Sequence, residues 1–381
     1  MALALIYITI SCLIIWRSSH GFEIASDFLG RKLPAGIKGA TLNAVASSMP
    51  EFLTTIFFLF YLRDAEGFSG GLGVASGSAL FNLLIIPALA VLMLFSIGKG
   101  KHLLLNKKVL LREGLVLLVS QIVFVNFLFR GELVAIHGLI LVLIYLAYLG
   151  LLYRITRRTS MKDPGFKTPE EKTGRSIFLR LLTLEITPLV LNGKSLSRNR
   201  AWALLGISTL IMTFGTWLLV YGTDLFGHVT GIPLIFVAVV LSAAATSVPD
   251  TVISIKDARK GNYDDAVSNA LGSNIFDIAF ALGMPILLYD IFFEEPLRLN
   301  PEMLFFTKEV WVFLLLATCL ALVIMLVGKK FNRPKAFMLL GIYALFLLFV
   351  GTQVNPDLEG IGQPIGNFLR DVANGIGKVL H

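Results

Sequence analysis

The chain is divided into apolar runs long enough to cross a lipid bilayer, and no other feature restricts its fold as strongly. A membrane-spanning helix needs about 20 predominantly apolar residues, because its backbone must be hydrogen-bonded internally in hydrocarbon. Only 15% of the residues are charged, whereas a soluble domain has about 25%. The sequence therefore predicts an all-α polytopic membrane protein with ten transmembrane helices. They are expected at Leu3–Leu29, Ile37–Leu62, Gly70–Ile97, Leu115–Phe129, Glu132–Arg154, Ala201–Phe226, Ile232–Ile255, Asp265–Ile291, Val310–Val327 and Ala336–Val350.

The basic residues mark one side of the membrane. The net charge is +8 and the pI about 9.4, but the lysines and arginines fall in short loops between apolar runs, so they do not indicate a nucleic-acid-binding protein. They gather in every second loop and in the segment 155–200, whose apolar middle, Phe178–Leu191, is expected to form a short interfacial helix. The positive-inside rule places these loops in the cytoplasm and both termini outside, and the plasma membrane is the expected location.

The ends of the chain and the two cysteines add little. Met1–Trp16 is apolar from its first residue, so it is interpreted as the start of the first helix rather than as a cleaved signal. Cys12 and Cys319 lie in apolar runs and imply no disulfide framework. The tail after Asn355 is Gly-rich, and we expect it to be only weakly amphipathic and assign it no function.

An internal repeat relates the two halves of the chain. Ala-Val-Ala-Ser-Ser-Met-Pro-Glu51 matches Ala-Ala-Ala-Thr-Ser-Val-Pro-Asp250, and Gly-Ser-Ala-Leu-Phe-Asn82 matches Gly-Ser-Asn-Ile-Phe-Asp277. Five spans, an odd number, separate corresponding helices, so the second half is expected to cross the membrane upside down. Inverted repeats with interrupted helices are typical of secondary transporters. The predicted organisation is a first five-helix repeat (1–154), a cytoplasmic basic loop (155–200), a second five-helix repeat (201–353) and a C-terminal tail (354–381).

The two copies bring together oxygen ligands. Pro50 and Pro249 each remove a helical hydrogen bond and free a carbonyl one turn back, and the glycines of the second motifs, Gly77 and Gly272, allow close helix packing. Carboxylates, an amide and hydroxyls suit Ca²⁺ and Na⁺ and suit Zn²⁺ or Cu poorly. The candidate metal-binding residues are Glu51, Asp250, Asp277, Asn82, Ser47, Ser48, Ser78, Thr246, Ser247 and Ser273.

With these motifs the chain resembles the calcium/cation antiporter superfamily, the sodium/calcium exchangers. Ala-Thr-Ser-Val-Pro-Asp250 and Gly-Ser-Asn-Ile-Phe-Asp277 are especially similar to the potassium-dependent branch. The resemblance implies a ten-helix inverted-repeat exchanger in which Glu51 and Asp250 bridge Ca²⁺ and the other candidates surround the ion sites. It implies transport rather than enzyme activity, no cofactor, and no obligate protein partner. The chain departs from the family in two places. The first copy has Ser-Ser-Met-Pro-Glu51 where a Gly- or Thr-containing version is usual, and the first helix carries Arg17, His20 and Glu23 where Gly-Ala-Asp is usual.

The expected function is therefore exchange of Ca²⁺ for Na⁺, with or without K⁺, by alternating access. Crowded carboxylates oppose one another's charge until a cation neutralises them, so the loaded site is expected to cross more readily than the empty one. A proton-coupled Ca²⁺ exchanger of the same fold remains the alternative. A channel would share the acidic ligands, but inverted broken helices favour alternation. An intramembrane aspartyl protease would need a Gly-x-Gly-Asp run, which the sequence lacks.

Overall fold

The structure is a computed structural model and is almost entirely helical. It describes residues 1–31, 44–98, 102–156, 179–180, 183–192, 194–261, 263–328, 330–355 and 359–380. The elements of the first half are α1 (Ala2–Leu29), α3 (Ala44–Phe57), η2 (Phe58–Leu62), α4 (Ala65–Leu80), η3 (Phe81–Ile85), α5 (Ile86–Ser96), β1 (His102–Leu104), α6 (Lys107–Phe129), β2 (Glu132–Leu133) and α7 (Ala135–Thr156). The rest are α9 (Ile186–Leu191), α10 (Arg198–Thr230), α11 (Leu234–Val237), η4 (Ala238–Ser242), α12 (Ala243–Thr246), α13 (Val248–Lys260), α14 (Tyr263–Phe276), η5 (Asp277–Ala281), α15 (Gly283–Phe293), β3 (Leu297–Arg298), α16 (Pro301–Leu326), β4 (Lys330–Asn332), α17 (Arg333–Val354) and α18 (Glu359–Leu380).

The predicted membrane-spanning helices are confirmed. Within the described residues, nine helices are long and apolar enough to cross a bilayer, and a tenth span forms if α11–α12 and α13 are taken together across a bend of 42°. Large apolar side chains such as Leu210 and Phe292 lie exposed on the outside of the bundle, where hydrocarbon rather than water is their natural surrounding. The chain is thus an all-α, multi-pass integral membrane protein.

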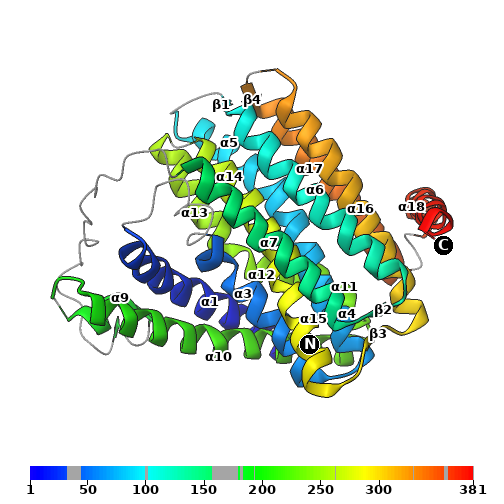
Figure 1. Ribbon diagram of the computed structural model, residues 1–381, viewed down its shortest axis with the longest axis horizontal. Helices are drawn as coiled ribbons and strands as arrows, with labels where there is room; N and C mark the ends of the chain where they lie inside the picture. Colours follow the sequence, from blue (N-terminus) through cyan, green and yellow to red (C-terminus); the bar gives the residue numbers. More distant parts are fainter. Residues whose placement is uncertain are drawn as a thin grey trace.

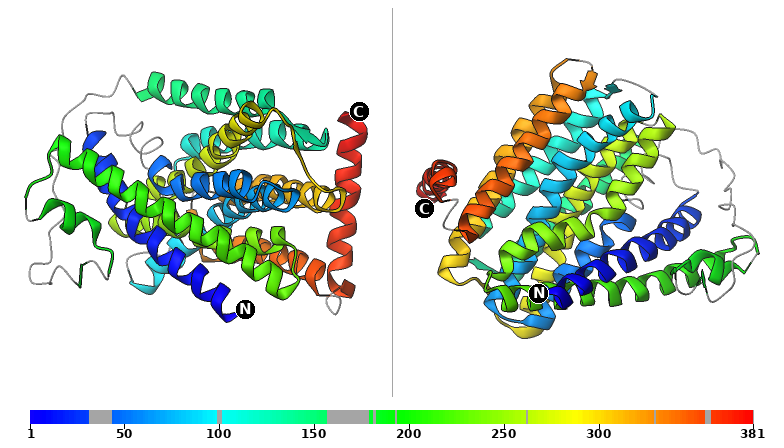
Figure 2. Two further views of the ribbon diagram at one scale, coloured as in Figure 1. Left: turned by 90° about the horizontal axis from the view of Figure 1, so that it is seen from below. Right: turned by 180° about the vertical axis from the view of Figure 1, so that it is seen from behind.

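Two helices stand apart from the remaining bundle. α1 and α10, the first and sixth spans, pack along each other and cross the other helices at an angle (Figure 1; Figure 2). The other helices form a tighter body in which α4 packs on α11 and η4, and α14 packs on α6 and α3. Corresponding members of the two halves therefore occupy corresponding places.

Two short strand pairs join the halves on opposite faces of the body. β1 pairs antiparallel with β4, and β2 pairs antiparallel with β3. Because β1 and β3 follow corresponding spans of the two halves, and β2 and β4 do likewise, each pair is the repeat image of the other. We call these two ends of the molecule the β1–β4 face and the β2–β3 face. Each strand of one half thus pairs with a strand of the other half, and the two pairs lie at opposite ends, as expected for an inverted repeat.

Irregular helix occurs where the repeated motifs lie. The second half is broken at Ser247, which separates α12 from α13 just before Pro249. In the first half α3 continues through Pro50, so the interruption expected there is absent from the described part of that span. In both halves the Gly-Ser motif ends in a π-helical turn, η3 around Asn82 and η5 starting at Asp277. Such turns are frequent at functional sites.

Two expectations about polar segments were wrong in part. A single helix over Phe178–Leu191 does not form, because Leu184 adopts a left-handed conformation (φ 50°) and only Ile186–Leu191 continues as α9, beside α1 and α10. Most of 155–200 lies outside the described residues. The tail is strongly rather than weakly amphipathic: it forms α18, a 22-residue helix that lies across the ends of α16 and α17 on the β2–β3 face (Figure 2). Its apolar residues recur every three to four positions, which buries Leu369 and Ala373 against the bundle.

Candidate cation-binding site

The ten candidate residues meet in the interior of the bundle, midway along its helices. They come from α3, α4 and η3 in the first half and from α12, the break at Ser247, α13, α14 and η5 in the second. All are essentially inaccessible, with the carboxylates of Glu51, Asp250 and Asp277 at most 1% exposed. The site is thus closed to both faces in this conformation.

Glu51 is joined to Asp277 through serines. Ser78 Oγ donates to Glu51 Oε1 at 3.1 Å and lies 3.5 Å from Asp277 Oδ2. Ser247 Oγ is 2.9 Å from Ser78 Oγ and 3.5 Å from Glu51 Oε1. Since Ser78 and Ser247 come from opposite halves, the two repeats share one oxygen cluster here.

Asp250 is held by amide and hydroxyl donors. Asn82 Nδ2 donates to Asp250 Oδ2 at 3.0 Å, and Ser273 Oγ donates to Asp250 Oδ1 at 2.7 Å. Asn269 Nδ2 lies 3.4 Å from the same Oδ1. Neutral donors therefore occupy positions around the carboxylate that a bound cation would otherwise fill.

The other hydroxyls line the edge of this cluster. Ser47 Oγ is 3.3 Å from Ser273 Oγ and also bonds the Ala44 carbonyl. Thr246 donates to the Ala243 carbonyl, as hydroxyls in membrane helices commonly do. Ser48 is buried beside Asp277, and Thr246 beside Glu51. The structure thus brings all ten predicted residues together.

Several buried oxygens in the cluster have no hydrogen-bond partner among the described residues. They are Glu51 Oε2, Asp277 Oδ1, Asn82 Oδ1 and Ser48 Oγ. An unpaired buried acceptor is costly, and a cation bound by several such oxygens removes that cost. Within the described residues no three Asp, Glu, His or Cys side chains converge on one point. The donor set therefore fits an oxygen cage of mixed carboxylates, hydroxyls and amide, not a cluster of acids alone.

A cavity approaches the site from the β1–β4 face. It has a volume of about 220 Å³ and lies between α1 and α13, reaching Pro249 next to Asp250. Its wall includes Arg17, His20, Glu23 and Lys256. Glu23 Oε2 is 3.7 Å from Lys256 Nζ and 3.3 Å from His20 Nδ1, so one carboxylate links the two helices that border the cavity. The charged residues of the first helix, Arg17, His20 and Glu23, thus line this cavity.

The sequence interpretation missed two polar residues next to the site. Asn269 lies one turn before Ser273, in the same Ser-Asn-Ala-Leu-Gly-Ser-Asn run, and contacts both Asp250 and Ser254. Asn274 Nδ2 donates to the Ala79 carbonyl at 2.8 Å and so fastens α14 to α4. The i, i+4 spacing of Asn269 and Ser273 was the signal that could have identified Asn269.

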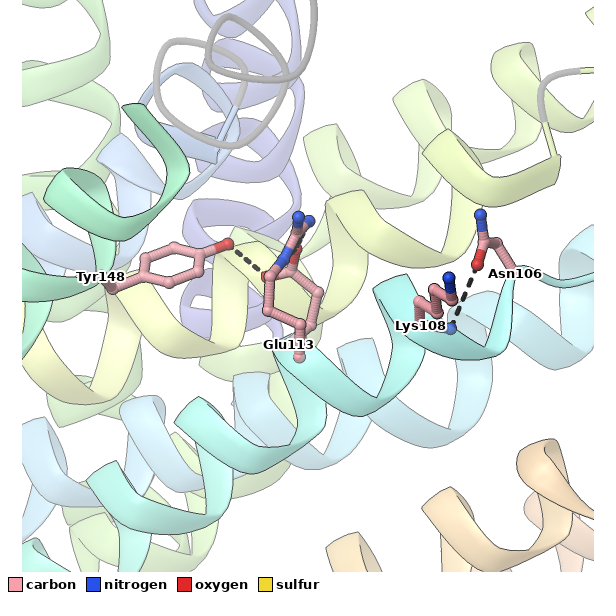
Figure 3. Close-up of polar contacts among 5 residues, drawn as sticks. Asn106, Lys108, Glu113 and Tyr148 are labelled. Carbon is pink, nitrogen blue, oxygen red and sulfur yellow. Dashed lines mark hydrogen bonds and ion pairs between the residues drawn. The ribbon is translucent and has the colours of Figure 1, made fainter. Parts of the chain in front are cut away.

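A further buried carboxylate, Glu113, belongs to a separate cluster. The Tyr148 hydroxyl donates to it, and the Arg112 guanidinium pairs with it at 2.5 Å (Figure 3). Figure 3 shows the Tyr148 ring reaching across from α7 to α6. Glu113 is fully buried near the start of α6, and a buried acid of α16, Glu309, pairs with Arg370 of α18 at 3.3 Å. Because both acids already have a cationic partner, we interpret them as structural pairs.

The sequence as a whole matches a known protein family. The family model described as sodium/calcium exchanger protein matches residues 3–154 and 200–352. Inner membrane protein YrbG of Escherichia coli is 25% identical over 350 residues, 91% of this chain and 96% of its own length. Human sodium/potassium/calcium exchanger 2 is 35% identical over 144 residues, 38% of this chain but only 21% of the human protein.

Solved structures share the fold. An H⁺/Ca²⁺ exchanger CAX superposes with a TM-score of 0.70 at 15% identity, covering 99% of this chain and 91% of that one. The sodium-calcium exchanger NCX_Mj superposes with a TM-score of 0.55 at 21% identity, covering 91% and 97%. At these identities the likeness extends to the fold alone.

Proposed function

We propose that this chain, which belongs to the sodium/calcium exchanger protein family, is a secondary antiporter that moves Ca²⁺ in exchange for Na⁺. Family membership makes it a Ca²⁺/cation exchanger and a transporter. The choice of Na⁺ as the exchanged ion is our proposal. So is the use of K⁺ as a further substrate.

The observation that carries the proposal is the mixed oxygen cage. Glu51 and Asp250 supply the charge that a divalent ion needs, while Asn82 and the serines supply neutral oxygens from both halves. Proton exchange would require only the carboxylates. The additional hydroxyls, several of which are fully buried, favour a second cation that binds neutral oxygens, as Na⁺ does.

The residues divide into roles on this basis. Glu51 and Asp250 bridge Ca²⁺, and Asp277 with Ser48 and Ser78 forms a site for a monovalent ion beside it. Ca²⁺ and Na⁺ then compete for shared oxygens, so one ion must leave before the other can be bound in full. A cage without a cation holds carboxylates in a fully buried environment, and that cost opposes transit of the unloaded protein.

The orientation is also proposed. The β1–β4 face carries Lys256, Arg259 and Lys260 at the end of α13, so the positive-inside rule assigns it to the cytoplasm, with both termini outside and the plasma membrane as the location. We retain 1–154 and 201–353 as the two repeats, 155–200 as the connecting loop and 354–381 as an appended tail.

The test is Ca²⁺ uptake into vesicles that contain the purified protein. Vesicles loaded with Na⁺ and diluted into choline are expected to take up Ca²⁺, with K⁺ varied separately. The Asp250→Asn variant removes the charge at the centre of the cage and is expected to abolish uptake. Retained uptake in that variant would contradict the assigned site.

Proton coupling is the rival in the same assay. Uptake that follows a pH gradient and ignores Na⁺ would leave the fold and the cage unchanged but move the function to Ca²⁺/H⁺ exchange. No uptake under either gradient would contradict both.

A further inference from the structure

Asn269 and Ser254 extend the oxygen network one helical turn beyond the central site, towards the β1–β4 face. Asn269 Nδ2 is 3.4 Å from Asp250 Oδ1 and 3.4 Å from Ser254 Oγ. Ser254 is fully buried and Asn269 is 8% exposed. Neither residue is among the ten candidates, yet both contact or adjoin the carboxylate at the centre of the cage.

Only one of the two polar atoms of the Asn269 carboxamide has hydrogen-bond partners among the described residues. Its nitrogen serves as the donor in both contacts, while Oδ1 is buried with no partner among the described residues. The two ends of a carboxamide have nearly the same shape. Rotation of the group therefore exchanges them, and Oδ1 then faces Asp250 and Ser254 without any movement of the backbone.

The oxygen spacing after that rotation suits a cation. Oxygen ligands lie about 2.3–2.6 Å from an ion such as Ca²⁺, so two ligands at a right angle are about 3.3–3.7 Å apart. Asn269 lies at 3.4 Å from both neighbours. Only one of the three groups, Asp250, carries charge, and this favours a monovalent ion over a divalent one.

The arrangement is present in one half only. Four residues before Ser78, the position matching Asn269 is Val74, which is buried. Four residues after Glu51, the position matching Ser254 is Thr55. The first half therefore lacks the amide, and an ion leaving the centre towards the β2–β3 face has no corresponding ligand at this position.

We propose that Asp250, Ser254 and Asn269 form a second binding site for a monovalent cation, Na⁺ in the first instance, through which the ion passes between the cage and the β1–β4 face. The Na⁺ assignment rests on the proposed function. Because Asp250 belongs to both sites, a cation here competes with Ca²⁺ in the cage. Release of Na⁺ to this face is thereby tied to the arrival of Ca²⁺.

Two substitutions separate a ligand from a mere hydrogen-bond donor. Asn269→Leu removes both functions and keeps a side chain with the same branching and the same number of heavy atoms. Asn269→Asp keeps oxygen ligands but removes the N–H donor and adds a negative charge beside Asp250. A cation ligand tolerates or gains from the Asp substitution, whereas a residue that only donates to Asp250 is damaged by it as much as by Leu. Val74→Leu is the matched control at the repeat-equivalent position.

The first readout is Na⁺ binding by the purified full-length protein, measured by calorimetry with NaCl against choline chloride in Ca²⁺-free buffer. Asn269→Leu is expected to weaken binding of one Na⁺ by about tenfold or more, the loss of about 1.4 kcal/mol. Asn269→Asp is expected to bind at least as tightly as the unmodified protein. Equal damage by both substitutions, or by neither, would overturn the site.

The second readout is side-specific. In membrane vesicles of known orientation, Asn269→Leu is expected to raise the Na⁺ concentration for half-maximal Ca²⁺ exchange at the β1–β4 face and to leave the other face within about twofold, which is below about 0.4 kcal/mol. An equal rise on both faces would also overturn the proposal. Failure of Na⁺ to drive Ca²⁺ flux in the unmodified protein, with Na⁺ binding still dependent on Asn269, would refute the proposed coupling and leave the second site standing.

Discussion

At the scale of single residues, the three central carboxylates differ in how fully they are hydrogen-bonded. Asp250 accepts from Asn82, Ser273 and Asn269. Asp277 lies 3.5 Å from Ser78 Oγ and beside Ser48, and one of its oxygens has no partner among the described residues. Asp277 also corresponds to an amide, Asn82, in the first half. Asp277 is thus the central carboxylate with the weakest hydrogen bonding, and the residue at its position in the first half, Asn82, is uncharged.

Asp277→Asn is therefore expected to change the monovalent-ion dependence of exchange more than Ca²⁺ binding. The substitution makes the two halves alike and removes charge from the position we assign to a monovalent ion. Na⁺-driven Ca²⁺ uptake, measured with and without K⁺, checks this. Asp224→Asn, on α10 and paired only with His228 among the described residues, provides the same chemical change away from the site. An unaltered cation dependence in Asp277→Asn would count against the assigned role.

The Glu113 pair gives a stability prediction. Arg112→Met leaves a buried carboxylate whose remaining partner, among the residues that the structure describes, is the Tyr148 hydroxyl. The substitution is expected to lower the free energy of unfolding by about 1–3 kcal/mol. Adding Glu113→Gln removes the charge but keeps an acceptor for Tyr148, so most of the loss is expected to be recovered. Thermal unfolding in detergent measures both. A double variant as unstable as Arg112→Met would show that the unpaired charge of Glu113 is not the cause of the instability.

Residue identities at the site were predictable, but their partners were not. The two copies of the repeated motif contain all ten candidate residues, so the sequence alone was enough to select them. Asn269 shares a helix face with Ser273, and that spacing could have identified it. Its contacts with Asp250 and Ser254, and the contact of Glu113 with Tyr148, join separate helices, and helical spacing alone does not reveal such contacts.

At the scale of helices, the glycine of the Gly-Ser motif packs differently in the two halves. A Cβ atom on Gly77 would lie 2.1 Å from the Val239 carbonyl oxygen, so α4 can approach η4 only with glycine there. A Cβ on Gly272 would meet only Ala44 Cβ, at 4.0 Å, among the described residues. The expectation that both glycines permit close packing is therefore confirmed for Gly77 and wrong for Gly272.

Gly77→Ala is accordingly expected to prevent correct assembly or abolish exchange, since backbone at Val239 would have to move. Gly272→Ala is the matched control and is expected to fold and transport normally. Size-exclusion elution in detergent and Ca²⁺ uptake measure the two variants. Equal tolerance of both substitutions would contradict the close approach of α4 and η4.

The tail helix α18 is also an element-scale result. Its apolar positions follow helical spacing, but the glycines around them obscured this, and its docking depends on Arg370, which reaches Glu309 and lies 5.0 Å from the Phe305 ring. It follows residue 352, where the match to the family model ends. The helix therefore lies outside the part of the chain that the family model matches.

Removal of residues 356–381 is expected to lower the thermal stability of the protein while leaving Na⁺-driven Ca²⁺ uptake per folded molecule intact. The deletion uncovers the surface that Leu369 and Ala373 occupy and leaves Glu309 without the cation that pairs with it. Adding Glu309→Gln to the shortened chain is expected to restore part of the stability. Loss of transport at unchanged stability would instead make α18 part of the exchange mechanism.

At the scale of the whole molecule, the span count and the inversion of the two halves followed from the sequence, because hydropathy and the repeat each restrict topology independently. The separate position of α1 and α10 could not be predicted from the sequence, because their apolar composition resembles that of the other spans. The strand pairs could not be predicted either, because strands of two or three residues are too short to show an alternating apolar and polar pattern.

The exchange of strands between the halves bears on how such a chain could arise. If each half were a separate polypeptide that inserts in both orientations, two copies would meet head to tail, and β1–β4 and β2–β3 would be the same contact seen twice. One gene duplicated and joined through a connecting loop would then preserve that dimer within a single chain. Two joined copies can then diverge independently, and the amide at 269 where the other half has Val74 is a difference of that kind.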